Sequence, residues 1–115
     1  MSRRPIHLLV EDIWEAIEKV NRYTEGMTGQ SFEADERTAD AVARNLEIVG
    51  EAASRLPDEF KQEHPEIEWA KVAGLRHRIV HEYFGVDLKI IWRILKKDLP
   101  ELGKILQRIR EELKR

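Results

Sequence analysis

Four side chains in the second half of the chain could act together on a phosphate ester: Arg76, His77, His81 and Tyr83. A histidine can take the proton from an attacking 2′-hydroxyl, because an imidazole exchanges protons near neutral pH. A guanidinium keeps its charge and can hold the phosphoryl oxygens. This combination of groups points to phosphodiester chemistry that requires no metal ion.

The spacing of these residues would bring them together at the end of one helix, predicted over Glu68–Tyr83. Each residue advances about 100° around a helix axis, so His77 and His81 fall one turn apart on the same side. On the same helical wheel Arg76 falls in the middle of the apolar arc. An unpaired guanidinium in a dry core is costly, so we expect Arg76 to meet a carboxylate, a subunit interface or an anionic ligand.

A structural role is the alternative interpretation of the same four residues. Arg76 could pair with Glu47 or Glu51 of the preceding long helix, His81 could cap a helix end, and Tyr83 could belong to the core. Ion-pair networks and satisfied histidines are common in proteins, so spacing alone favours structure over catalysis.

A metal site is a third interpretation, because two histidines four residues apart on a helix can chelate an ion. The segment from His77 to His81 lacks the glutamate of the HExxH motif, and Glu82 or His64 would have to serve as a third ligand. We therefore expect neither a metal ion nor a cofactor.

The segments that must position these groups carry apolar residues every three or four positions, which predicts an all-α protein. Pro5 opens a helix that runs to about Tyr23, and Asp35 caps a second long helix that Pro57 ends. Between these two helices, residues 26–31 are predicted to form a loop.

The rest of the chain is also predicted to be helical. Residues 58–64 could form one or two turns before the third long helix. Gly85 ends that helix and Asp87 starts a fourth. Pro100 either kinks this fourth helix or begins a last one. The result is four or five helices and no strand.

Composition limits the broad class of protein. A length of 115 residues fits one domain over 1–115, and 42% hydrophobic with 37% charged residues is far from the disordered regime. The absence of cysteine excludes disulfides and thiolate sites and is typical of a reducing compartment, which favours the cytoplasm. Acidic residues interrupt the short apolar run after Arg4, so no signal core is expected, and no segment has the length to span a membrane.

Charge is divided unevenly along the chain. Residues 1–70 hold 8 basic and 16 acidic side chains, whereas residues 71–115 hold 12 and 6. A basic second half weakly favours a polyanionic partner such as RNA, although the two halves could also simply neutralise each other.

The motif itself resembles a known family. Residues 76–83 have the form R-x4-H-x-Y and are followed by the sequence FGVD at 84–87. Together with other segments, this motif resembles the HEPN superfamily and, within it, the HepT-like (DUF86) group. The other segments that carry the resemblance are Arg44–Ala53, His64–Ile67, Trp69 and Ala73–Leu75.

The resemblance implies an antiparallel bundle of four to five helices that dimerises, so that the motifs of two protomers face each other across a composite cleft. It implies metal-independent cleavage of RNA, with Arg76 binding phosphate and His81 acting as general base or acid. The residue after the arginine is commonly asparagine in this family. Here it is His77, which is expected to assist or to bind substrate.

The resemblance also implies a biological context. HepT-like proteins are typically toxins of type VII-like toxin–antitoxin systems, and an MntA-type minimal nucleotidyltransferase neutralises them. The partner would adenylylate Tyr83, and assembly with it could extend beyond the homodimer. The alternative is a non-catalytic module that binds a nucleotide or docks a nucleotidyltransferase.

Overall fold

The computed structural model describes residues 3–82 and 88–115, apart from the side chains of His81 and Glu82. Every regular element in these residues is helical, which confirms the all-α prediction, and none of their helices is long and apolar enough to cross a membrane. The elements are α1 (Ile6–Tyr23), α2 (Gly29–Ala34), α3 (Glu36–Arg55), α4 (Asp58–Glu63), α5 (Trp69–Ala73), α6 (Leu75–Glu82), α7 (Leu88–Arg93), the π-helix η2 (Ile94–Asp98) and α8 (Leu99–Leu113).

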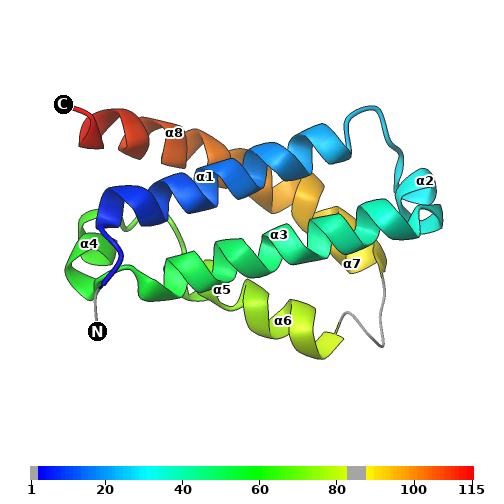
Figure 1. The fold of residues 1–115 in the computed structure, drawn as a ribbon, viewed down its shortest axis with the longest axis horizontal. Coiled ribbons are helices and arrows are strands. Elements are labelled where there is room, and N and C mark those ends of the chain that lie inside the picture. Colours follow the sequence, from blue (N-terminus) through cyan, green and yellow to red (C-terminus); the bar gives the residue numbers. More distant parts are fainter. Residues whose placement is uncertain (1–2, 83–87) are drawn as a thin grey trace.

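Helices α1 and α3 lie side by side and run in opposite directions along the length of the molecule (Figure 1). The apolar rows predicted for them are the rows that the structure buries. On α3 the buried row includes Val42, Leu46 and Val49, none of which is accessible to solvent. Asp35 caps α3 as predicted, because its Oδ1 accepts a hydrogen bond of 3.0 Å from the Thr38 backbone N–H.

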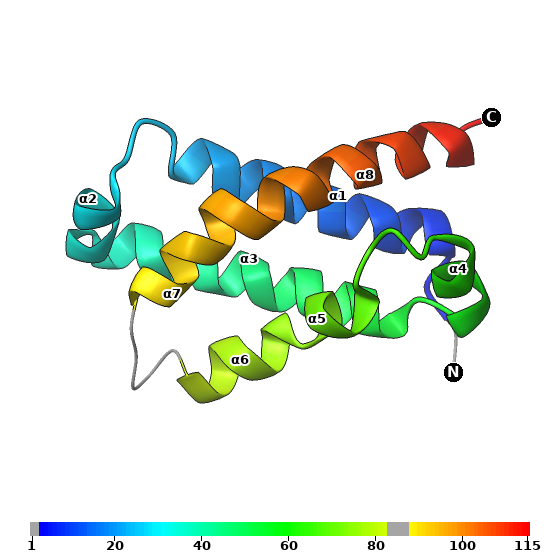
Figure 2. The same cartoon turned by 180° about the vertical axis from the view of Figure 1, so that it is seen from behind.

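The C-terminal segment α7–η2–α8 crosses the far side of this pair, as seen in Figure 2. Its buried residues Leu99, Leu106 and Ile109 complete the hydrophobic core with those of α1 and α3. Helix α6 lies along the other edge of α3 (Figures 1 and 2). Because α3 contacts both α1 and α6, it is the element on which the motif helix is positioned.

The predicted loop over 26–31 is wrong in part, because it contains the start of α2. Thr28 and Ser31 form a capping box, in which each side-chain oxygen accepts a hydrogen bond from the other residue's backbone N–H. Phe32 of α2 is fully buried and lies 5.2 Å from Trp92, measured between ring centroids. Contact with α7, far away in the sequence, therefore stabilises this short helix.

The predicted continuous helix over 68–83 is also wrong, because Gly74 divides it into α5 and α6. The Gly74 N–H donates to the Ala70 carbonyl at 3.0 Å, and the Gly74 carbonyl accepts from the Arg78 N–H at 3.0 Å. Glycine has a low helix propensity, which favours an interruption here. Both bonds span four residues, so the chain stays close to helical through Gly74 although the regular helix is interrupted there.

Pro100 lies in the first turn of α8, which agrees with the prediction that it begins the last helix. Ahead of it the backbone widens into η2, where the Leu99 N–H donates to the Ile94 carbonyl five residues earlier. Proline has no N–H and its ring crowds the preceding turn, so a π turn is a reasonable accommodation. The helix end at Tyr83, the stop at Gly85 and the start at Asp87 lie outside the described residues.

Candidate functional site

Helix α6 approaches α3 most closely where Gly50 faces the backbone of Arg76. A Cβ atom at position 50 would lie 2.6 Å from the Arg76 backbone nitrogen and 3.1 Å from the Ala73 carbonyl oxygen. Real Cβ atoms do not approach other atoms this closely, so only glycine permits the contact. The glycine at position 50 thus determines how closely the start of α6 can approach α3.

The Arg76 side chain leaves this contact and reaches the residue that follows Gly50. Its Nε lies 3.3 Å from Oε2 of Glu51, which is one of the two carboxylates predicted for it. The side chain is 59% exposed, so the prediction that Arg76 sits amid apolar side chains is wrong for the single chain. Leu75 and Ile79 of the same helix face the core, whereas Arg76 and Val80 lie on the side of α6 that faces an open cleft.

Glu51 binds a second arginine from its own helix. Arg55 Nε donates to Glu51 Oε1 at 3.1 Å, while Arg76 contacts the other oxygen of the same carboxylate. One turn earlier on α3, Arg44 pairs with Glu47 at 3.5 Å. Two guanidinium groups therefore share one carboxylate beside the motif helix.

These charged side chains line an open cleft of about 350 Å³ between α1, α3 and α6. Val80 also lines it and is 40% exposed, which is unusual for a large apolar side chain in this protein. The cleft is lined by Leu9, Asp12, Arg44, Glu47, Ile48, Glu51, Ala52, Arg55, Arg76 and Val80.

The remaining predicted site residues are placed only in part. Positions 77 and 81 both belong to α6 and are one helical turn apart, as the spacing predicted. The His77 side chain is exposed. The side chain of His81 and the whole of Tyr83 lie outside the described residues.

No group of three or more histidine, cysteine, aspartate or glutamate side chains in the described part of the chain is arranged to hold a metal ion. The three tryptophans have structural surroundings. Trp69 is buried and its Nε1 donates to the His64 carbonyl at 3.0 Å. Trp14 and Trp92 are half-buried and lie under the cationic groups of Arg110 and Lys96.

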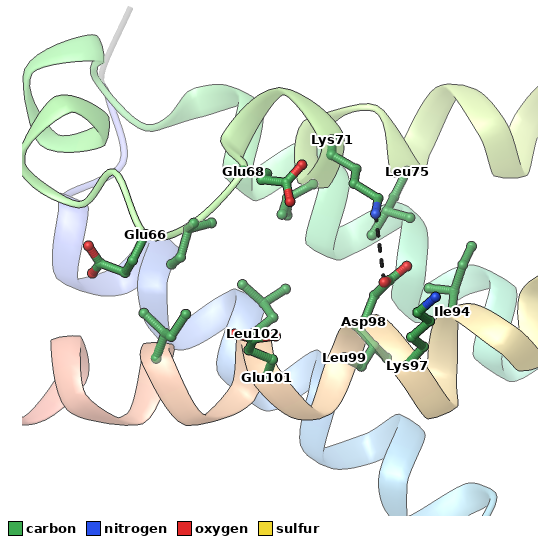
Figure 3. Close-up of a pocket in the computed structure, with 13 residues that line it drawn as sticks. Glu66, Glu68, Lys71, Leu75, Ile94, Lys97, Asp98, Leu99, Glu101 and Leu102 are labelled. Atoms are coloured by element: carbon green, nitrogen blue, oxygen red, sulfur yellow. Dashed lines mark ion pairs between the residues drawn. The ribbon is translucent and has the colours of Figure 1, made fainter.

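A second pocket, of about 150 Å³, lies between α5 and the η2–α8 segment (Figure 3). Lys71 points across it toward Asp98, with 3.7 Å between the charged atoms. Leu75 lines this pocket, whereas Arg76 lines the cleft, so the two concavities lie on different faces of the α5–α6 segment. The second pocket contains none of the motif residues that the structure describes.

Two features of the site were not predicted from the sequence: the presence of Arg55 in the cleft and the exposure of Val80. The i, i+4 spacing of Glu51 and Arg55 on a helix is a recognisable signal for an ion pair. It could not reveal that the same carboxylate also meets Arg76, because this contact depends on how α6 docks against α3.

Comparison with known proteins gives consistent results. The family model described as "Ribonuclease HepT-like" matches residues 13–109. The chain is 41% identical over 102 residues to a protein named "Probable ribonuclease HepT" from Thermococcus cleftensis, covering 89% of this chain and 93% of that relative. It is 37% identical over 105 residues to a "Putative RNase" of Caldanaerobacter subterraneus subsp. tengcongensis, covering 91% and 94% of the two chains.

A longer relative comes from Methanocaldococcus jannaschii and is named "Gamma-glutamylcyclotransferase and putative RNase". It is 38% identical over 111 residues, which cover 96% of this chain but 50% of the relative. No solved structure matches the chain significantly. Since the family model spans most of the sequence and full-length relatives share more than a third of their residues with it, this chain belongs to the HepT-like ribonuclease family.

Proposed function

We propose that this protein is a metal-independent endoribonuclease in which Arg76 and His81 act on the RNA backbone. The observation that carries the proposal is the Arg76 guanidinium, which is exposed in the cleft yet held by Glu51. Arg76 is also on the same helix as positions 77 and 81. Membership of a ribonuclease family supports RNA as the substrate.

In this proposal Arg76 binds the non-bridging oxygens of the scissile phosphate and offsets the charge that develops during attack. His81 takes the proton from the attacking 2′-hydroxyl, or supplies one to the leaving oxygen. His77 assists or binds substrate. Each of these steps uses the protein's own side chains, so EDTA should not inhibit cleavage.

A homodimer is part of the proposal. Val80 exposes an apolar side chain next to Arg76, and Ile48 across the cleft is only half-buried. Apolar side chains at the edge of a charged cleft are common where a second subunit binds. Two protomers joined there would line one composite RNA-binding cleft.

The proposed biological role is that of a toxin in a type VII-like toxin–antitoxin pair. An MntA-like nucleotidyltransferase would transfer AMP from ATP to the Tyr83 hydroxyl, with release of pyrophosphate, and so neutralise the toxin. The added phosphate would be negatively charged and would compete with RNA for the Arg76 guanidinium. Family membership supports this role, since the motif tyrosine follows Arg76 by seven residues in this sequence.

The first experiment is cleavage of total cellular RNA by the purified protein in the presence of EDTA. Wild-type protein should cleave, and His81→Ala should reduce the rate by about 10²–10⁴-fold, the usual contribution of a general acid or base. His7→Ala is the matched control, because His7 is an exposed histidine near the start of α1 and should be dispensable. Absence of cleavage by clean, unmodified protein would favour the non-catalytic docking module instead.

A further inference from the structure

A pair of arginines, and not Arg76 alone, faces the cleft beside the motif helix. Arg55 and Arg76 approach the same carboxylate from two helices, with contacts of 3.1 and 3.3 Å to its two oxygens. Their side chains are 60% and 59% exposed. A ligand that enters the cleft can therefore reach both guanidinium groups.

When the charged side chains that line the cleft are paired off, the positive charge that remains unbalanced lies on these two arginines. Six charged side chains line the cleft, three acidic and three basic. Asp12 is paired with Arg4, through contacts of 2.6 and 2.8 Å, and Glu47 is paired with Arg44. Glu51 is left to balance two guanidinium groups, so the group of Arg55, Glu51 and Arg76 carries a net positive charge.

Stability is a poor explanation for such a group. Exposed ion pairs contribute little to folding, and two like charges held beside each other repel. A guanidinium has five N–H donors, so the contact that Arg76 makes with Glu51 through Nε leaves donors on its Nη atoms. Two arginines whose remaining donors face one cleft match the charge and the oxygen acceptors of a nucleic-acid backbone.

We infer that Arg55 is a second phosphate-binding residue for RNA and that Glu51 is the positioning residue that holds Arg55 and Arg76 side by side. This inference rests on the proposed ribonuclease function and extends it to a residue outside the motif. Arg76 binds the scissile phosphate, and Arg55 binds the same strand beside it. Glu51 contacts no RNA and acts through the two arginines.

The test measures binding of a fluorescein-labelled oligouridylate by anisotropy at several KCl concentrations, with His81→Ala as the parent so that the RNA stays intact. Loss of one phosphate contact on a single strand reduces the slope of log K against log salt by about 0.7. Arg55→Gln should show this reduction, and Arg55→Lys should retain the parent slope because the charge remains. Arg108→Gln is the matched control, since Arg108 is a similarly exposed arginine paired with Glu66 at 2.8 Å.

The positioning role of Glu51 has a separate kinetic readout in the otherwise wild-type protein. Glu51→Gln removes a negative charge from the cleft, so KM should stay equal or fall, while kcat falls because Arg76 loses its fixed orientation. A purely structural role would lower thermal stability and leave both constants unchanged, which would overturn the assignment of Glu51.

The outcomes distinguish a failure of the inference about Arg55 from a failure of the proposed ribonuclease function. If wild-type protein cleaves RNA and His81→Ala does not, but Arg55→Gln keeps the parent slope, the inference about Arg55 is wrong and the proposed function stands. If the His81→Ala parent does not bind the oligouridylate and wild-type protein does not cleave RNA, both are wrong. Circular dichroism of each variant establishes that the helices are intact.

Discussion

Gly50 and Arg76 are in direct contact through their backbones, since a Cβ at position 50 would lie 2.6 Å from the Arg76 nitrogen. The next residue on α3, Glu51, holds the Arg76 side chain at 3.3 Å. Two consecutive residues of α3 thus fix both the backbone and the side chain of the motif arginine. The position of Arg76 in the cleft is a property of the α3–α6 contact and not of α6 alone.

Gly50→Ala should destabilise the protein, although alanine is the better helix former. The Cβ would force α6 away from α3, and overpacking of this kind costs about 1–3 kcal/mol. Urea unfolding should show this loss. RNA cleavage should fall as well, because the Arg76 guanidinium moves away from Glu51.

Gly103→Ala is the control for helix propensity. Gly103 also lies within a helix, but its added Cβ would meet only the Ile17 Cγ2 at 3.7 Å, an ordinary van der Waals distance. This variant should be stabilised by about 0.5–1 kcal/mol. Equal effects at positions 50 and 103 would refute the proposed close approach of α6.

Leu46→Ala should be strongly destabilising. Leu46 is fully buried on α3 at the centre of the core, and truncation of such a leucine costs about 2–5 kcal/mol. The midpoint of urea unfolding measures the change. Leu113→Ala, at the exposed end of α8, should alter stability by about 0.5 kcal/mol or less, and a similar cost at both positions would contradict the packing described here.

Stability should fall in acid through the cap of α3. Hydrogen bonds from the Thr38 backbone N–H and hydroxyl lower the pKa of the Asp35 carboxyl below its ordinary value. A lowered pKa in the folded state means that the cap contributes fully above about pH 4 and is lost as the pH falls through the folded-state value.

Thermal melts between about pH 3 and pH 6 test this dependence. Asp35→Asn keeps a side-chain oxygen for the cap but has no charge to titrate, so its melting temperature should decline less steeply in acid than that of the wild type. Parallel curves for the two proteins would show that Asp35 does not contribute to the acid sensitivity.

Tyr83→Phe should separate neutralisation from catalysis. The variant should still cleave RNA but should not gain the mass of an AMP group when it is incubated with ATP and an MntA-like nucleotidyltransferase. Tyr23→Phe is the natural control, because the chain has only two tyrosines and the Tyr23 side chain is exposed. If the Tyr83→Phe protein were still adenylylated, at Tyr23, the assignment of Tyr83 as the modified residue would be wrong.

Local patterns in the sequence determined the helices that form the frame. The rows of apolar residues on α1 and α3 repeat every three or four positions, and such a row can be buried only if its segment is helical. The cap at Asp35 acts over three residues, so it too was predictable. The motif at 76–83 likewise lies within one stretch of sequence, which is why the family could be identified before the structure.

Other features depend on contacts between distant segments. Helix α2 persists because Phe32 packs on Trp92, and the helix predicted over 68–83 is interrupted at Gly74. Neither the Phe32–Trp92 contact nor the break at Gly74 can be predicted from a periodic pattern of apolar residues. Arg76 and Val80 are exposed because their side of α6 faces the open cleft, and a helical wheel cannot show whether another element covers a given side of a helix.

The ion-pair partner of Arg76 illustrates the difference between what the sequence predicts and what only the tertiary structure decides. The sequence by itself offered Glu47 and Glu51 as candidate partners, and these are one turn apart on the same helix and therefore almost equivalent in pattern. Only the tertiary structure decided for Glu51, because the glycine before it sets where α6 docks on α3. The period of the apolar residues determines which face of a helix is buried. The position along one helix at which a second helix contacts it depends on the side chain, or the lack of one, at the point of contact.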